Sequence, residues 1–206
     1  FMNRIEHREE KWEFPFVEYS PEDMGDEKLP LILQLHGAGE RGDGSDLSLV
    51  DVHGFSKVIA DKEIPCIFVM PQCPTESFWA AKVESIITFI GQLVEEFNVD
   101  ADKICLTGLS MGGYGTWYTA MARPDLFSAI APVCGGGMAW NAKRLVNIPA
   151  WAFHKEKDPT VSLDESVKMV EAVNRAGGWA KLTVYPGEGL PASLGVLHYS
   201  PDQEDI

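Results

Sequence analysis

Short apolar runs separated by amphipathic stretches limit the possible folds of this sequence more than any other feature. Within each run the apolar residues follow one another without polar alternation, which is typical of strands covered on both faces. A further short run, 17–19, is interpreted as an edge strand. The predicted buried strands are 31–36, 66–70, 103–107, 128–133, 150–154 and 180–185.

Helical patterns occupy the stretches between these runs. Over 79–98, apolar residues recur every three or four positions and form one face of a helix. Ser162 and Glu165 form a capping box, and Gly177 and Gly178 supply a stop, which predicts a helix over 163–176. Strands and helices that alternate with short loops predict an α/β fold: a mostly parallel central sheet with helices on both faces. A site in such a sheet lies at the carboxyl ends of its strands.

Composition limits the partners of the chain. Its 206 residues, 45% hydrophobic and 23% charged, suit a single domain over 1–206. A net charge of −14 opposes binding to nucleic acid or to anionic membranes, so we expect a small-molecule substrate. No apolar run is long enough to span a bilayer.

Residues 1–11 lack the apolar core of a signal peptide, which favours a cytoplasmic location. The chain opens on Phe1, however, and a leader removed upstream would instead imply secretion.

The cysteine pattern favours reduced thiols. Three of the four cysteines lie in or beside apolar runs, so we expect them buried and unpaired, with Cys66 and Cys73 as the one plausible close pair. No Cys-x-x-Cys or His-x-x-x-His spacing occurs, and we therefore expect neither a structural zinc site nor another cofactor.

A Gly-x-Ser-x-Gly pentapeptide centred on Ser110 marks the candidate nucleophile. It follows the strand 103–107 directly and precedes a helix-compatible run over 113–122, which is the setting of a nucleophile elbow. Side chains at Gly108 and Gly112 would collide with the neighbouring strand and helix, and the serine would be exposed at a helix N-terminus. The alternative is a glycine-rich turn with an incidental serine.

An oxyanion hole needs two N–H donors, and two segments offer them. The amide of Met111 directly follows the candidate nucleophile, and Ala38 lies in the glycine-rich segment 36–42 after the first buried strand. An ordinary glycine loop is the alternative for 36–42. Arg41 is expected either to orient a substrate carboxylate or to pair with Glu40 or Asp43.

Asp158 is the candidate acid of a catalytic triad. It follows the strand 150–154 at a carboxyl strand end, and the triad order in such folds is serine, acid, histidine. Glu156 and Asp164 compete with it for this role. A solvated loop aspartate is the other interpretation of Asp158.

His198 is the candidate base because no other histidine follows Asp158. The loop 187–197 is long enough to return to the site, and a surface histidine near the chain end is the alternative. His36 and His154 end strands and are expected to pack or hydrogen-bond locally.

The chain resembles bacterial carboxylesterases of the predicted-peptidase or phospholipase/carboxylesterase group, near the feruloyl esterases and dienelactone hydrolases. This resemblance implies the α/β-hydrolase fold, Ser110 as nucleophile, Asp158 as acid, and the Ala38 and Met111 amides as oxyanion hole. It extends over about 29–186, and HGAGERG with GLSMGGYGTW is its most specific part. The full set of matching stretches is LPLILQLHGAGERG, FVMPQCP, DADKICLTGLSMGGYGTW, APVCGGG and NIPAWAFHKEKDPTVSLDESVKMVEAVNRAGG.

Two positions depart from that group. Lys155 stands where a glycine is usual before the acid, and Leu190 occupies the turn that usually carries the catalytic histidine. The usual C-terminal helix is also missing after Ile206. A histidine displaced to His198, a truncated or altered sequence and a catalytically weak protein are each compatible with these departures.

The leading functional hypothesis is a serine esterase that forms an acyl-enzyme. We expect short-chain or aromatic acyl esters as substrates, including esters carried on polysaccharide, with Trp79 and Tyr114 as substrate-binding aromatics. Core packing is the alternative for Trp117. The competing hypotheses are a serine peptidase and a binding module whose triad has decayed.

Overall fold

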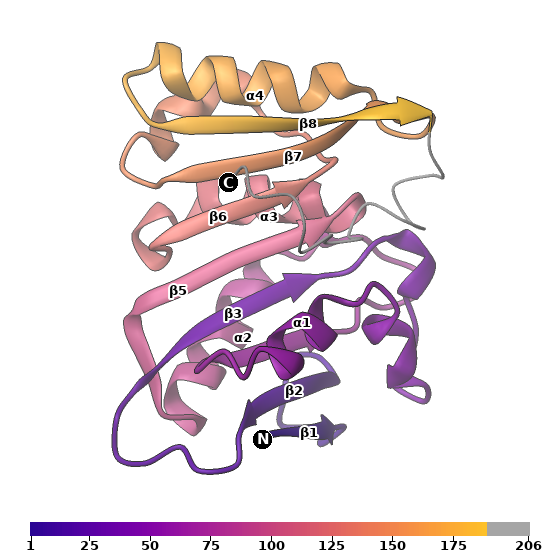
Figure 1. Cartoon of the computed structure of the whole chain (residues 1–206), viewed down its shortest axis with the longest axis vertical. Helices are drawn as coiled ribbons and strands as arrows, with labels where there is room; N and C mark the ends of the chain where they lie inside the picture. Colours follow the sequence, from indigo (N-terminus) through magenta and orange to yellow (C-terminus); the bar gives the residue numbers. More distant parts are fainter. Residues whose placement is uncertain (189–206) are drawn as a thin grey trace.

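One eight-stranded sheet organises the chain (Figure 1). The computed structural model describes residues 1–188. Within them the strand order is β1-β2-β4-β3-β5-β6-β7-β8, and the six strands from β4 to β8 are parallel. β1 and β2 form an antiparallel hairpin that joins β4 at one edge. The strands are β1 (Met2–His7), β2 (Phe16–Pro21), β3 (Leu29–Leu35), β4 (Ile67–Pro71), β5 (Val99–Leu109), β6 (Ala129–Val133), β7 (Ala150–Lys157) and β8 (Ala180–Glu188).

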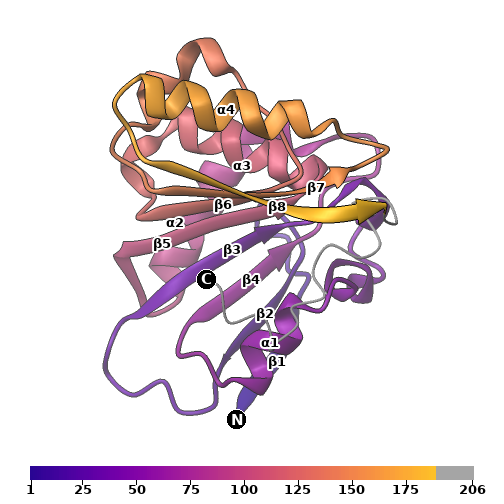
Figure 2. The same ribbon diagram turned by 45° about the horizontal axis from the view of Figure 1, so that its top comes forward.

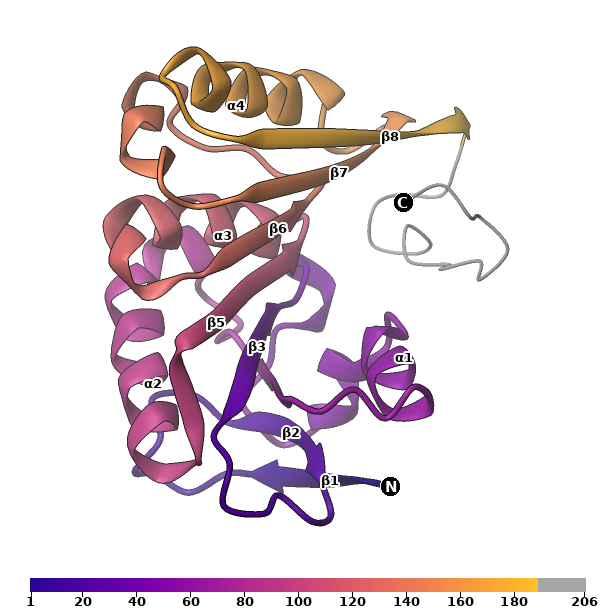
Figure 3. The same cartoon turned by 60° about the vertical axis from the view of Figure 1, so that its left-hand side comes forward.

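Helices pack on both faces of the sheet. Figures 2 and 3 show α2, α3 and α4 on one face and α1 on the other. Five short 3-10 helices lie in the connections of the described chain. This architecture confirms the predicted fold class. The helices are α1 (Phe55–Asp61), α2 (Val83–Glu96), α3 (Met111–Ala122) and α4 (Leu163–Arg175), with η1 (Ala38–Glu40), η2 (Leu47–Asp51), η3 (Trp79–Ala81), η4 (Pro124–Leu126) and η5 (Ala139–Leu145).

The apolar runs form the core, as their lack of polar alternation predicted. Every residue of β4 is buried, and Leu31, Leu33 and Leu35 of β3 have no exposed surface. The apolar stripe of α2 closes against this side of the sheet through Ile86, Phe89, Ile90 and Leu93. Burying such side chains stabilises the fold by roughly 1.5–3 kcal/mol each before entropy is counted.

The N-terminal hairpin corrects the prediction for 17–19. That segment belongs to β2, which pairs with both β1 and β4 and is therefore not an edge strand. The strand at the edge is β1, whose MNRIEH sequence carries no apolar alternation and whose residues are all at least partly exposed. Pairing with β2, rather than burial of its own side chains, holds β1 in the sheet.

The predicted helix over 79–98 is interrupted. Residues 79–81 form η3, and α2 begins only at Val83. The expected α4 cap is confirmed: Ser162 Oγ accepts from the Asp164 amide at 3.3 Å. The predicted stop is also confirmed, because Gly177 takes a φ of 96° that favours glycine.

All four cysteines are free thiols. Cys66 and Cys73, the expected close pair, lie at the two ends of the extended strand β4, so roughly 20 Å of backbone separates them. Residues 1–188 gather no group of three or more His, Cys, Asp or Glu side chains suited to a metal ion. No helix in the described chain is both long and apolar enough to cross a bilayer.

Candidate active site

Ser110 occupies a sharp turn between β5 and α3. Its φ of 54° and ψ of −111° lie outside the regions that a side chain normally allows, at a cost on the order of 1–3 kcal/mol. Its amide donates to the Val133 carbonyl at 2.9 Å, which ties the turn to the end of β6. The serine thus stands at the carboxyl edge of the sheet, at the N-terminus of α3.

Two glycines make this turn possible, as the sequence predicted. A methyl group at Gly108 would overlap the carbonyl of Gly112, in the first turn of α3. A methyl group at Gly112 would overlap the carbonyl of Leu35, at the end of β3. The helix can therefore begin this close to the sheet only without side chains at both positions.

The two candidate oxyanion amides lie at matched positions on neighbouring strands. Leu35 of β3 pairs with Gly108 of β5, and Ala38 and Met111 each follow three residues later. Ala38 begins η1 and Met111 begins α3. The first amide of a helix has no acceptor within its own helix, so both N–H groups are available to a ligand.

His36 fixes the start of the loop 36–46, which contains the candidate oxyanion donor Ala38 and which we call the oxyanion loop. Its Nε2 accepts from the Cys73 amide at 2.9 Å, so the ring proton lies on Nδ1, which contacts the Gly37 carbonyl at 2.6 Å. Burial lowers the pKa of His36 from 6.5 to about 4. A neutral imidazole of one tautomer therefore supports the loop, in agreement with the expected local role of His36.

Trp79 lies beneath the oxyanion loop and not on its surface. Its side chain is fully buried, its Nε1 donates to the His36 carbonyl at 3.0 Å, and its ring contacts that of His36. The expectation that Trp79 contacts substrate therefore does not fit its burial. In the structure it positions the backbone next to Ala38.

Gln72 holds the far half of the oxyanion loop, a role that the sequence analysis missed. It is 1% exposed and directly follows β4. Its Nε2 donates to the carbonyl of Glu40 at 3.0 Å, and its Oε1 accepts from the Gly44 amide at 2.8 Å. A side-chain amide, with its donors and acceptor fixed in one plane, suits this bridging position.

Glu40 and Arg41 serve the loop in different ways. Burial opposes ionisation of Glu40, but His53, 3.2 Å away, together with His36 and the Gly37 backbone, outweighs that effect and lowers the pKa of the carboxyl group. Arg41 donates to the carbonyls of Ala38 at 2.9 Å and Ser77 at 3.0 Å. Among the described residues it forms neither of the expected ion pairs with Glu40 or Asp43.

Asp158 directly follows β7 and has a buried carboxylate. Its side chain is 1% exposed, and its Oδ1 accepts from the amides of Thr160 at 2.8 Å and Val161 at 2.9 Å. Within residues 1–188 its Oδ2 is buried and has no hydrogen-bond partner. A buried carboxylate oxygen without a donor is costly, so this atom is suited to accept an N–H from another side chain.

The surroundings of Glu156, Asp164 and His154 differ from those of Asp158. Glu156 and Asp164 are both exposed. His154 is fully buried, and its Nε2 lies 3.7 Å from Asp158 Oδ2. Both ring nitrogens are already engaged, with the Val161 carbonyl at 2.9 Å and Ser166 Oγ at 2.8 Å, which matches its expected local role.

Cys134 lies between the candidate nucleophile and the candidate acid. It follows β6 with a φ of 40°, and its thiol is fully buried. Burial is the main cause that raises the pKa of this thiol to about 12; the Ser110 amide opposes the shift and the Asp158 carboxylate adds to it. Ser110 and Asp158 therefore approach the same side chain from β5 and β7, the strands on either side of β6.

Tyr114 is the aromatic residue that remains accessible beside this turn. It lies one helical turn after Ser110 and is partly exposed. Burial and then the Glu165 carboxylate raise the pKa of its hydroxyl. Trp117, one turn further along α3, is fully buried in the core, as its alternative interpretation held. The candidate base His198, and Leu190, lie outside the described residues.

Comparison with known proteins gives a partial family match. The model of the prolyl oligopeptidase family matches residues 80–140, the stretch that contains α2, β5, Ser110 and α3. A crystal structure of a thermostable esterase is 33% identical and superposes with a TM-score of 0.77, covering 90% of this chain and 55% of the other.

Curated relatives of this chain include proteins that are named as esterases. The bifunctional acetylxylan esterase/xylanase XynS20E of Neocallimastix patriciarum is 24% identical over 71% of this chain. Acetylxylan esterase A of Emericella nidulans is 25% identical over 57% of this chain. The chain spans 22% of the length of the first and 36% of the second.

The buried His36 predicts a pH dependence of stability. Because its folded pKa of about 4 lies below 6.5, the unfolded state binds more protons between these values. The free energy of unfolding should therefore fall as pH drops from 6.5 to 4, by about 3 kcal/mol from this residue alone. Urea unfolding of the wild type and His36→Gln at several pH values measures it. The variant should lose that part of the slope, and equal slopes would contradict the assignment.

Proposed function

We propose that this chain, which has the α/β-hydrolase fold, is a serine carboxylic-ester hydrolase acting through an acyl-enzyme. The observation that carries this proposal is the strained turn at Ser110, whose two glycines leave no room for any side chain. Strain of this kind persists where the surrounding structure enforces it, and it is concentrated at functional sites.

In the first step Ser110 Oγ attacks the carbonyl carbon of the ester, and the imidazole of His198 takes the hydroxyl proton. The Ala38 and Met111 amides donate to the resulting oxyanion. Asp158 Oδ2 accepts the other imidazole N–H, while its Oδ1 stays bound to the Thr160 and Val161 amides. The carbon–oxygen bond to the alcohol then breaks, and the imidazolium gives its proton to the departing alcohol oxygen.

The second step releases the acid. A water molecule gives a proton to the imidazole and attacks the acyl-serine carbonyl, again forming an oxyanion at the same amides. Collapse of this intermediate breaks the bond to Ser110 Oγ, which recovers its proton from the imidazolium. The products are the free carboxylic acid and the starting enzyme.

We propose short-chain or aromatic acyl esters carried on polysaccharide as the substrates. The two curated relatives named as acetylxylan esterases support an acetyl ester on a sugar chain. The half-buried Tyr114 near Ser110 offers an aromatic surface to a small acyl or phenolic group. A net charge of −14 also favours a neutral ester over an anionic substrate.

A serine peptidase is the second candidate function. The match to the prolyl oligopeptidase family model favours it, although that match is limited to 80–140. Hydrolysis of p-nitrophenyl acetate compared with an N-acyl-aminoacyl p-nitroanilide separates the two reactions. We expect the ester to be cleaved at least a hundredfold faster, and faster cleavage of the anilide would favour the peptidase.

The first prediction for this site concerns Ser110→Ala. The variant should lose ester hydrolysis by roughly 10⁴-fold or more, because the attacking oxygen is removed. Its thermal unfolding should stay close to that of the wild type. Ser77→Ala, a change of the same size at another residue of the carboxyl edge, is the control. An alanine variant that kept wild-type kcat would contradict the proposed nucleophile.

The second prediction concerns Asp158→Asn. The amide oxygen can keep the bonds from Thr160 and Val161, but the NH2 group in place of Oδ2 cannot accept from an imidazole. We expect kcat to fall by about 10²- to 10⁴-fold. Asp164→Asn and Glu156→Gln make the same change at the exposed acids and should stay near wild type. Loss of activity in either control instead of in Asp158→Asn would move the acid to that position.

The third prediction concerns His198→Ala, which should reduce kcat by about 10³-fold or more if His198 is the base. The rate of p-nitrophenyl acetate hydrolysis, with and without added imidazole, measures it. An unchanged rate would contradict the assignment. In that case Leu190→His, which places a histidine where the related carboxylesterases carry theirs, should raise the activity.

A further inference from the structure

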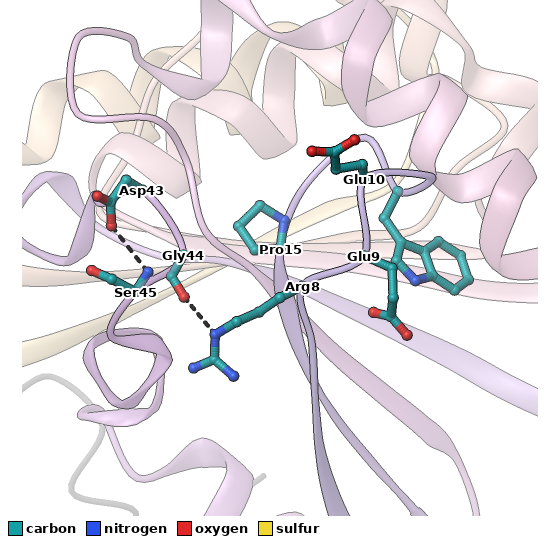
Figure 4. A pocket seen from close by; sticks show the side chains of 8 residues that line it. Arg8, Glu9, Glu10, Pro15, Asp43, Gly44 and Ser45 are labelled. Atoms are coloured by element: carbon teal, nitrogen blue, oxygen red, sulfur yellow. Dashed lines mark hydrogen bonds between the residues drawn. The ribbon is translucent and has the colours of Figure 1, made fainter.

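A cavity of about 390 Å³ lies between the loop 8–15 and the far end of the oxyanion loop. Phe16, which follows the first of these loops, pairs with Pro71 at the carboxyl end of β4. The cavity therefore opens on the same edge of the sheet as Ser110. Figure 4 shows Asp43, Gly44 and Ser45 on one side of it and Glu9 and Glu10 on the other.

The walls of this cavity are fixed by contacts through Gly44. Arg8 Nε donates to the Gly44 carbonyl at 2.7 Å, as Figure 4 also shows, and the Gly44 amide donates to Gln72 at 2.8 Å. A side chain at Gly44 would collide with the ring of Pro15, and the backbone φ of 87° at Gly44 also favours glycine. The two loops thus meet at a backbone contact, and the cavity is formed without a ligand.

The lining favours a neutral ligand with many hydroxyl groups. The carboxylates of Glu9, Glu10 and Asp43 accept hydrogen bonds, and Ser45 can donate or accept them. Glu9, Glu10 and Asp43 line the cavity with Arg8 as the one cation among the lining residues, and Arg8 already pairs with Glu6 at 2.6 Å, so an anion is disfavoured. Pro15 and the small exposed part of Trp12 add apolar surface of the kind that packs against a sugar ring.

The oxyanion loop connects this cavity to the reacting atoms. Asp43 follows Ala38 by five residues, so their backbones are at most roughly 18 Å apart. Gln72 bonds both Glu40 and Gly44, and hence fixes the loop between the two positions. A linear sugar chain whose ester lies at Ser110 can therefore extend along the edge of the sheet into the cavity.

We propose that this cavity is a glycosyl subsite that binds an unesterified sugar unit of the polysaccharide, at a distance from the ester that is cleaved. The proposal rests on the proposed esterase function, and it adds the polymer chain as the feature that is recognised. A volume of about 390 Å³ lies at the lower end of the range of small-molecule sites, which suits one or two sugar rings.

The test compares kcat/KM for acetylated xylobiose, acetylated xylohexaose and p-nitrophenyl acetate. The wild type should favour the hexaose over the biose by about tenfold, the effect of one modest binding contact. Glu9→Trp fills the cavity from the loop 8–15 and should remove this advantage while leaving p-nitrophenyl acetate unchanged. Glu95→Trp, the same change at an exposed glutamate of α2, should retain it. No advantage in the wild type, or its survival in Glu9→Trp, would overturn the subsite.

Binding of unesterified xylohexaose, measured by titration calorimetry, separates failure of the subsite from failure of the esterase proposal. If the wild type hydrolyses no ester yet binds xylohexaose, and Glu9→Trp does not, the subsite stands and the esterase proposal fails. Equal binding by both proteins, or binding by neither, overturns the subsite. Glu10→Gln, with Glu95→Gln on α2 as its control, provides a milder variant that should weaken binding about threefold.

Discussion

The close approach of α3 to the end of β3 is the contact on which the rest of the site depends. Gly112 lies against the Leu35 carbonyl so tightly that no side chain fits, and Gly108 meets the first turn of the helix in the same way. This approach forces Ser110 into its strained conformation and sets Met111 at the start of α3. The Leu35–Gly108 pairing also brings Ala38 to the matching position on the neighbouring strand.

The carboxyl edge of the sheet is held by polar groups that are buried beneath it. His36, Gln72 and Trp79 bond the backbone of the oxyanion loop, and none of them is more than 5% exposed. Each bond joins a segment of the loop to the end of β4 or to η3, so the amide of Ala38 is positioned before any substrate arrives. Preorganised donors of this kind avoid reorganisation during the reaction.

Sequence reasoning predicted the elements that have a strong local signal. The apolar strands of the parallel sheet, the glycines around Ser110 and the capped helix α4 each follow from a pattern within a few residues. It missed β1, because the partly exposed residues of this strand carry no apolar pattern. It missed the role of Gln72, because the backbone groups that Gln72 bonds lie in another segment of the chain. The sequence indicates that Trp79 lies near the site, and hence predicts contact with substrate. It does not indicate that the side chain is buried beneath His36. The burial of Asp158, compared with the exposed Glu156, likewise became visible only in three dimensions.

The central claim is that Ser110 is an activated nucleophile, and covalent labelling tests it most directly. After reaction with a serine-directed fluorophosphonate, intact-protein mass spectrometry and peptide mapping locate any adduct. The account predicts a single adduct on the peptide that contains Ser110, absent in the Ser110→Ala variant. An adduct on another residue, or none under conditions that label a control serine hydrolase, would contradict it.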